Sequence, residues 1–306
     1  SSLLSKDESV NFANAVKGEY AEMRELHANR KSDVEYVSLK EARKNKLKLD
    51  WAKEEITKPN FVGVKVFDDY SLAELAEYID WSPFFSTWEM SGTYPRIFES
   101  DKYGKEAKKL FNDAQALLKK VIDEKWITAK AVIGIFEAKS NGDAVELANG
   151  TRFDFMRQQT QKNGRANFCL ADYVSPDKDY FGTFAVTTGI GIEKWIEKFE
   201  KDHDDYNSIM LKALADRLAE AFAERMHQLV RKELWGYAAN ETLTNEELVQ
   251  EKYQGIRPAP GYPACPDHTL KPQIWDLMDV EKNTGIKLTE SYAMYPTASV
   301  SGFYFA

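Results

Sequence analysis

The stretch ANFCLADYVSPDKDYFGTFAVT, residues 166–187, determines the fold class that we expect for this chain. Residues 166–174 and 180–187 are rich in aromatic and apolar side chains and read as two strands. Between them, the Ser-Pro pair and the aspartates of SPDKD are typical of a turn. The sequence therefore predicts an antiparallel hairpin in the middle of the chain.

Helical patterns surround this hairpin on both sides. Apolar residues recur at three-to-four spacing, and a serine stands at a helix-capping position before residue 72. Helices are predicted at residues 7–30, 71–81, 103–123, 206–234 and 270–283. AVIGIFEA (131–138) predicts a buried strand that ends in a turn at 141–143, and the end of the chain is also strand-like. Helices and hairpins without regular strand–helix–strand alternation favour an α+β fold.

The composition narrows the class of protein. A chain of 306 residues that is 43% hydrophobic can bury a large core. Its net charge of −8 gives no long-range attraction for nucleic acid or anionic lipid. No apolar run approaches the roughly 20 residues of a membrane helix, and no signal peptide is apparent. Two cysteines, Cys169 and Cys265, are typical of a reducing compartment. We therefore expect a cytoplasmic protein with neither nucleic acid nor membrane as partner.

The sequence shows none of the short motifs that would favour a hydrolase or a metalloenzyme. The four histidines share no metal-binding spacing, and the chain contains no GxSxG elbow. TTGIGIEKW (187–195) imitates a glycine-rich nucleotide loop but lacks the third glycine, so it reads as a connection. The acidic run DHDDY (202–206) is expected to cap the helix that follows it.

The stretch RPAPGYPACPDH (257–268) reads as a rigid loop because prolines restrict φ and glycine reaches conformations closed to other residues. Arg257 suits a bidentate grip on a carboxylate, and Gly261 would let a flat ring approach the main chain. Tyr262 offers a π-face and a hydroxyl. The loop therefore suits a ligand with a carboxylate and an aromatic ring. The alternative is that Arg257 pairs with a structural acid.

Several long blocks carry a family resemblance. YQGIRPAPGYPACPDHT (253–269) resembles the signature of the C-terminal activation domain of cobalamin-dependent methionine synthase, which binds S-adenosylmethionine. The similarity extends to residues 78–98, 157–174, 203–227 and 287–302. It spans nearly the whole chain. The resemblance implies a single C-shaped α+β domain with a twisted antiparallel sheet flanked by helices.

The resemblance also implies a cofactor site. Arg257 corresponds to a family contact to S-adenosylmethionine, with the loop backbone alongside the ligand, and Asp80 of the IDW motif suits the α-ammonium. Glu220 and Glu251 match further acids of the site, although such residues on charged helices are also commonly solvated. The implied contacts are Asp80, Glu220, Glu251, Arg257, Ala259, Gly261 and Tyr262. No side chain is expected to act as acid, base or nucleophile.

The implied function is the reductive methylation of inactive cob(II)alamin to methylcobalamin. Cobalamin is held by the cobalamin-binding module of the same polypeptide, and zinc belongs only to another module of the full enzyme. A flavodoxin or a diflavin reductase is the implied electron donor. The domain's own contribution is to bind and position the methyl donor.

The domain boundaries follow from the same resemblance. Residues 1–50 are expected to be a helix and linker from the cobalamin-binding module, with SSLLS as that module's last residues. Residues 51–306 are expected to be the activation domain without its last C-terminal segment. Two other functions stay open at this point: a stand-alone S-adenosylmethionine-dependent methyltransferase acting on a small molecule, and an interaction module that does not bind the cofactor.

Overall fold

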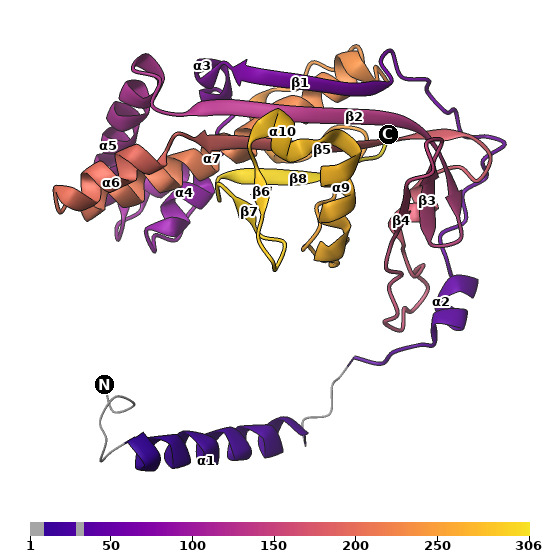
Figure 1. Cartoon of the computed structure of the whole chain (residues 1–306), viewed down its shortest axis with the longest axis horizontal. Coiled ribbons are helices and arrows are strands. Elements are labelled where there is room, and N and C mark those ends of the chain that lie inside the picture. Colours follow the sequence, from indigo (N-terminus) through magenta and orange to yellow (C-terminus); the bar gives the residue numbers. More distant parts are fainter. Residues whose placement is uncertain (1–8, 29–33) are drawn as a thin grey trace. The chain divides into compact units, whose positions relative to one another are not determined.

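The computed structural model describes residues 9–28 and 34–306 (Figure 1). The chain divides into two compact units. One comprises residues 1–46 with 158–167, and the other comprises residues 47–157 with 168–306. The segment SSLLS lies outside the described residues.

The smaller unit contains helix α1 (Ser9–Ala28) and helix α2 (Leu39–Lys44). Ser38 caps α2 and forms a capping box with Glu41. The 158–167 loop is held in this unit by the buried side chain of Asn167, which donates to the carbonyl oxygens of Gln158 and Thr160 at 2.8 and 2.9 Å. Asn45 donates to Asn167 Oδ1 at 2.8 Å. This buried amide, together with backbone hydrogen bonds from Val37 N to Gln159 O and from Gln161 N to Glu35 O, fixes the loop.

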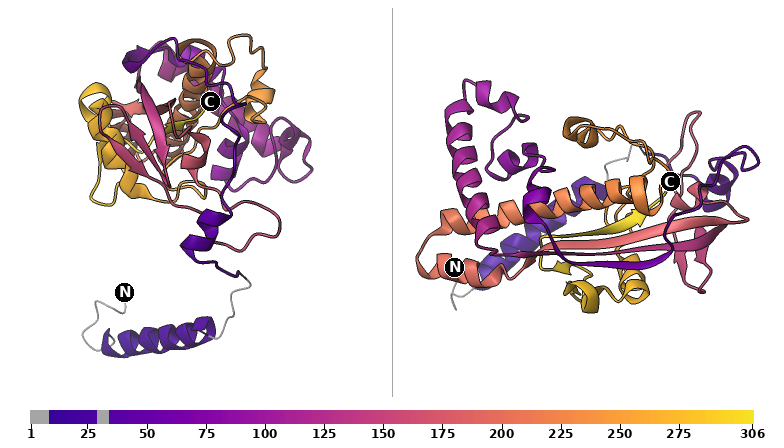
Figure 2. Two further views of the ribbon diagram at one scale, coloured as in Figure 1. Left: turned by 90° about the vertical axis from the view of Figure 1, so that its right-hand side faces the viewer. Right: turned by 90° about the horizontal axis from the view of Figure 1, so that it is seen from above.

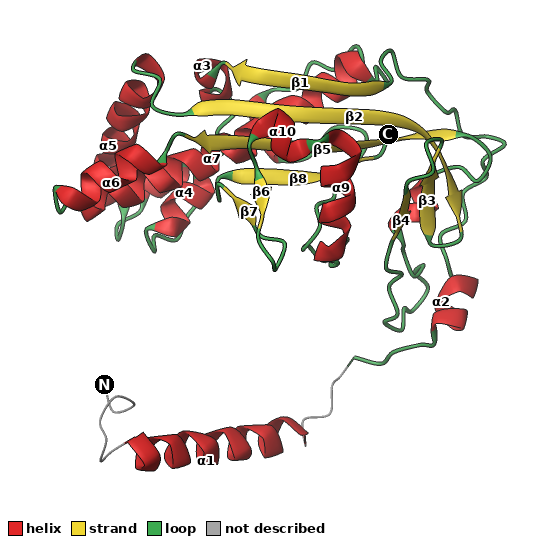
Figure 3. Cartoon of the chain, in the orientation of Figure 1, coloured by secondary structure: helices red, strands yellow, loops and turns green. Residues whose placement is uncertain are grey.

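The larger unit is built on an antiparallel sheet (Figure 3). Its strands are β1 (Gly63–Tyr70), β2 (Thr128–Asn141), β3 (Ala144–Leu147), β4 (Arg152–Asp154), β5 (Asp179–Ile190) and β8 (Ser299–Tyr304). They run in the order β4-β3-β2-β5-β8, and β1 also pairs with β2. β1 pairs with the first part of β2 and β3 with its last part, while β5 pairs along nearly all of β2. β2 is therefore the strand that joins the whole sheet.

Helices cover both faces of this sheet (Figure 2). Successive residues of β2 and β5 point to opposite faces, as the period of two requires. Ile133 and Phe184 pack in one core with the long helix α7 (Asp205–Leu229), whereas Val132 and Phe181 pack in a second core with α9 (Lys271–Met278) and α10 (Val280–Thr284). Burial on both faces explains why the middle of β2 is apolar and why nearly every residue of β5 is buried.

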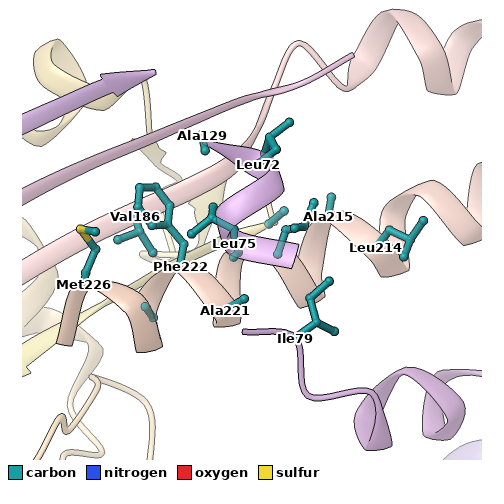
Figure 4. Packing of buried hydrophobic residues seen from close by; sticks show 14 of the residues in the cluster. Leu72, Leu75, Ile79, Ala129, Val186, Leu214, Ala215, Ala221, Phe222 and Met226 are labelled. Carbon is teal, nitrogen blue, oxygen red and sulfur yellow. The ribbon is translucent and has the colours of Figure 1, made fainter. Parts of the chain in front are cut away.

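The α7 core also attaches the short helices (Figure 4). Leu72 and Leu75 of α3 (Leu72–Ala76) are buried against α7, where Phe222 is fully buried and contacts the ring of Tyr70 at 5.0 Å between centroids. Ser71 caps α3 by accepting from Glu74 N. The other elements are α4 (Ser82–Thr87), α5 (Gly104–Asp123), α6 (Glu193–Lys201), α8 (Asn245–Val249), β6 (Lys287–Leu288), β7 (Met294–Tyr295), 3₁₀ turns at Arg96–Glu99, Leu170–Tyr173 and His268–Leu270, and a π-helical turn at Val230–Leu234.

Most predicted elements are confirmed. α1, α3, α5 and α7 occupy the predicted helical segments, and β2 and β8 are the predicted strands. Asp204 caps α7, as the acidic run predicts. The helix predicted at 270–283 is divided into α9 and α10 at Asp279, whose φ is +48°. The α+β class is confirmed.

The predicted hairpin is wrong in its first strand. Residues 180–187 lie in β5, but its partners are β2 and β8. Residues 166–174 instead contain a 3₁₀ turn, because Asp172 is buried and forms two 2.7 Å hydrogen bonds with the buried guanidinium of Arg157. Asp172 also accepts from Cys169 N at 3.1 Å. This buried ion pair with Arg157 holds an apolar segment in a turn rather than a strand.

Candidate functional site

The proline-rich segment is an irregular loop, as predicted, and its first residues lie against the edge of the sheet. Ile256 N donates to Phe305 O at 3.0 Å, and Phe305 N donates to Ile256 O at 3.1 Å. Phe303 N donates to Pro258 O at 2.9 Å. These three bonds fix the backbone on both sides of Arg257. Arg257 is therefore carried by the β8 edge of the sheet.

The second half of the loop forms a tight turn. Gly261 N donates to Cys265 O at 2.8 Å, and Cys265 N donates to Tyr262 O at 2.9 Å. Gly261 has a φ of +106°, and a Cβ at this position would stand 2.3 Å from Cε1 of His268. The space that Gly261 opens is thus occupied by a ring of this chain. Tyr262 is 61% exposed, and Ala259 is half-buried.

Arg257 reaches from this loop to α7. Its Nη1 donates to Glu224 Oε2 at 3.0 Å and to the carbonyl oxygen of Ala223 at 3.3 Å. The same nitrogen lies 3.5 Å from His227 Nδ1. The Arg257 side chain keeps 18% of its surface exposed. The internal acid that the sequence left as an alternative is therefore present, and it is Glu224.

A second buried arginine lies beside this pair. Arg231 is fully buried and binds Glu241 through two hydrogen bonds of 2.7 and 2.9 Å. Its Nη1 lies 3.6 Å from Glu224 Oε1. Neither of these two atoms has a hydrogen-bond partner in the described part of the chain. Glu224 thus lies between two cations, and only its bond to Arg257 has hydrogen-bonding geometry.

His227 is a neutral member of this buried cluster. Its ring stacks on Tyr304 and contacts the ring of Tyr253 edge-on. Burial, followed by the charges of Arg257 and Arg231, holds the pKa of His227 well below its ordinary value. Burial likewise raises the pKa of Tyr304 well above its ordinary value. The cluster therefore contributes uncharged rings beneath the two guanidinium groups.

Glu220 lies one helical turn before Glu224 on α7, beside a polar hollow of about 250 Å³. Asp216 lies one turn earlier and shares the hollow. Burial, together with the nearby charge of Glu220, raises the pKa of Asp216. The hollow is lined by Asp216, Arg217, Ala219, Glu220, Thr297, Ala298, Ser299 and Val300. An acidic row therefore leads along α7 toward Arg257.

Asp80 lies in a different and larger hollow, of about 630 Å³. Its Oδ1 accepts from Ser82 N at 2.9 Å, which fixes the carboxylate at the start of α4. The aromatic side chains of Tyr78, Trp81 and Tyr94 line this hollow. Glu251 is exposed, and it follows Val249 and Gln250, which close the hollow from the α8 side.

The predicted residues therefore fall into three groups. The structure brings Arg257 onto α7 one turn from Glu220, places Asp80 in the aromatic hollow, and leaves Glu251 at that hollow's border. Sequence reasoning missed Glu224. The signal was present, because glutamates four residues apart in the predicted helix share one face.

Comparison with known proteins decides the family. A family model described as the activation domain of vitamin B12-dependent methionine synthase matches residues 71–306. The chain belongs to this family. The resemblance drawn from the sequence blocks is confirmed, and all seven predicted site residues lie within the match. The chain is an activation domain of a B12-dependent methyltransferase.

A solved structure agrees with this assignment. The chain is 51% identical to a protein described as "Crystal Structure of the MetH Reactivation Domain bound to AdoHcy", with a TM-score of 0.86. The similarity covers 88% of this chain and 86% of that one. The activation domain here therefore shares the fold of a reactivation domain. Among the described residues, no helix combines the length and apolar character needed to cross a bilayer.

Proposed function

We propose that this activation domain binds S-adenosylmethionine along α7 and the Arg257 loop. The observation that supports this proposal is that Arg257 contacts an acidic face of α7. Its guanidinium, which suits the ligand's carboxylate, lies one helical turn from Glu220. S-adenosylmethionine carries both a carboxylate and positive charges. The solved relative bound to AdoHcy supports this choice of ligand.

Each end of this ligand has chemically suitable partners. Arginine presents planar paired donors that match a carboxylate. Glu220 and Asp216 offer negative charge in a partly water-excluded hollow, where attraction to an ammonium or sulfonium is stronger than in bulk water. We propose Asp80 and Glu251 as further acids of the site, with Ala259, Gly261 and Tyr262 as its backbone wall.

The domain's role is to position a methyl donor. When bound, S-adenosylmethionine supplies the methyl group that returns oxidised cobalamin to its methylated form. The residues of this chain contribute binding and orientation, which lower the entropic cost of bringing two cofactors together. We propose the cobalamin-binding module of the same polypeptide as partner, a flavodoxin or diflavin reductase as electron donor, and the cytoplasm as location.

Calorimetric titration with S-adenosylmethionine tests the site. A hydrogen bond to a charged group contributes about 1.5–3 kcal/mol, so Arg257→Ala should weaken binding about 10- to 100-fold. Asp80→Ala tests the aromatic hollow separately. Arg152→Ala is the control, because Arg152 pairs with Glu146 and Asp154 on the β3–β4 edge. Unchanged affinity in both Arg257→Ala and Asp80→Ala would exclude this site.

A second assay distinguishes the function from the two alternatives. With an electron donor present, the domain should support methylation of added cob(II)alamin and not of small nucleophiles. Methylation of a small nucleophile would favour a stand-alone methyltransferase. Absence of any S-adenosylmethionine binding by the folded protein would favour an interaction module.

A further inference from the structure

Glu224 has a place in the site that the family assignment does not give it. It lies on α7, and its partner Arg257 comes from a loop 33 residues further along the chain. Glu224 is the only acid within ion-pair distance of Arg257 in the described part of the chain. Its Oε1 is buried without a hydrogen-bond partner among the described residues, so Glu224 is not held by another hydrogen-bond network. Among the residues that the structure describes, the one hydrogen bond of the Glu224 side chain is to Arg257.

The bonds of Arg257 are all on one side of its guanidinium. The three contacts recorded in the described residues, to Glu224, Ala223 and His227, involve Nη1. A guanidinium has five donors in a fixed planar fork. With Nη1 held against α7, the Nε and Nη2 edge is the one available for a planar carboxylate. The partial exposure of the side chain agrees with an accessible edge.

The neighbouring Arg231 has its own acid. Glu241 binds it through two short bonds, so Arg231 does not depend on Glu224 for a hydrogen-bonded partner. Without Glu224, however, Arg257 and Arg231 would face each other as like charges, and only the weak contacts to Ala223 and His227 would direct Arg257. The orientation of Arg257 thus depends on one carboxylate.

We propose that Glu224 is a positioning residue that fixes the Arg257 guanidinium so that its outer edge receives the ligand's carboxylate. This inference rests on the proposed function, because it assumes that Arg257 binds S-adenosylmethionine. It predicts an effect confined to recognition of the carboxylate. A purely structural role would change stability without changing ligand selectivity.

The experiment compares two ligands that differ in one group. Dissociation constants are measured for S-adenosylmethionine and for decarboxylated S-adenosylmethionine, which lacks only the carboxylate. The readout is the preference for the first over the second. We expect Glu224→Ala to lower this preference about ten-fold, in keeping with one charge-assisted hydrogen bond. Glu224→Gln keeps an acceptor oxygen and should restore most of it.

Two further variants separate positioning from other causes. In an Arg257→Ala background the preference should already be lost, and adding Glu224→Ala should not lower it further. Glu241→Gln is the matched control, because it perturbs the neighbouring buried arginine without touching Arg257. It should leave the preference unchanged. Thermal unfolding of every variant shows which are folded, and Glu224→Met, which keeps a side chain of similar length without an acceptor oxygen, replaces Glu224→Ala if that variant does not fold.

The outcomes distinguish the two proposals. If Arg257→Ala lowers the preference but Glu224→Ala leaves it unchanged or raises it, the positioning role is wrong and the binding site stands. If Glu241→Gln lowers the preference as much as Glu224→Ala, the effect is general to the cluster and the inference also fails. If Arg257→Ala leaves the preference unchanged, the proposed function fails at its site.

Discussion

Gly261→Ala tests whether the Arg257 loop is held in shape by the conformation of one residue. Gly261 has a φ of +106°, which an L-residue adopts only with strain of about 1–3 kcal/mol. The new Cβ would also stand 2.3 Å from Cε1 of His268. Because His268 is exposed, its ring can move, and overpacking of this kind adds about 1–3 kcal/mol at most. We expect a total loss of about 2–6 kcal/mol of unfolding free energy.

A double mutant separates the two contributions. In a His268→Ala background the contact is absent, so Gly261→Ala should cost only the strain, about 1–3 kcal/mol. Gly142 provides the matched control: its φ is +67°, and nothing lies within 4 Å of a Cβ placed there. Its alanine variant should cost about 1–2 kcal/mol. Urea denaturation measures all of these values.

Two results would refute this reasoning. Complete rescue of Gly261→Ala by His268→Ala would mean that the backbone carries no strain. An unfolding free energy for Gly261→Ala equal to that of the unchanged protein would mean that the turn is not rigid. Since the turn follows Arg257 directly, the variant should also weaken S-adenosylmethionine binding.

Three further predictions concern the framework of the site. Phe222→Ala removes a fully buried ring between α7 and the sheet and should cost about 3–5 kcal/mol in urea denaturation, and a loss below 1 kcal/mol would contradict the described core. Ser71→Ala removes the cap of α3 and should cost about 1 kcal/mol, whereas no change would show that the 3.2 Å bond from Glu74 N contributes nothing. His227 has a lowered pKa when folded, so the unfolded chain binds its proton first as pH falls below the ordinary value of 6.5. At pH values below 6.5 the unfolding free energy should therefore decrease, by up to about 1.4 kcal/mol per pH unit, and it should decrease less in His227→Gln. Denaturation between about pH 7.5 and 5.5 measures this dependence. If the unfolding free energy changed equally with pH in both proteins, His227 would be rejected as its origin.

The elements that the sequence predicts well are those whose burial is set by one regular face. The stripe Ala107, Leu110, Ala114, Leu117 and Val121 of α5 is buried as predicted, because its spacing matches the helical repeat. The middle of strand β2 was also predictable, since both its faces are covered there and residues 131–136 are apolar. The local sequence pattern is therefore sufficient for elements whose own residues indicate which faces are buried.

Residues 166–174 show where such reasoning fails. Their apolar and aromatic content indicates a strand, but the structure of the segment is decided by Asp172 and its partner Arg157, fifteen residues away. A buried ion pair between distant residues leaves no periodic signal. The same limit applies to the site: the loop around Arg257 was predictable from its prolines, whereas its pairing with Glu224 depends on how the loop crosses α7.

The three backbone bonds between the Ile256–Pro258 segment and the end of the sheet have a mechanical consequence. They make Arg257 move with one layer of the molecule, while Glu220 and Glu224 move with the helix layer above it. The spacing of these groups in the proposed S-adenosylmethionine site therefore depends on the packing between those layers, where Phe222 and Met226 lie. Well-packed interiors transmit small changes in volume. Core side chains that do not contact the methyl donor thus set the width of its proposed binding site.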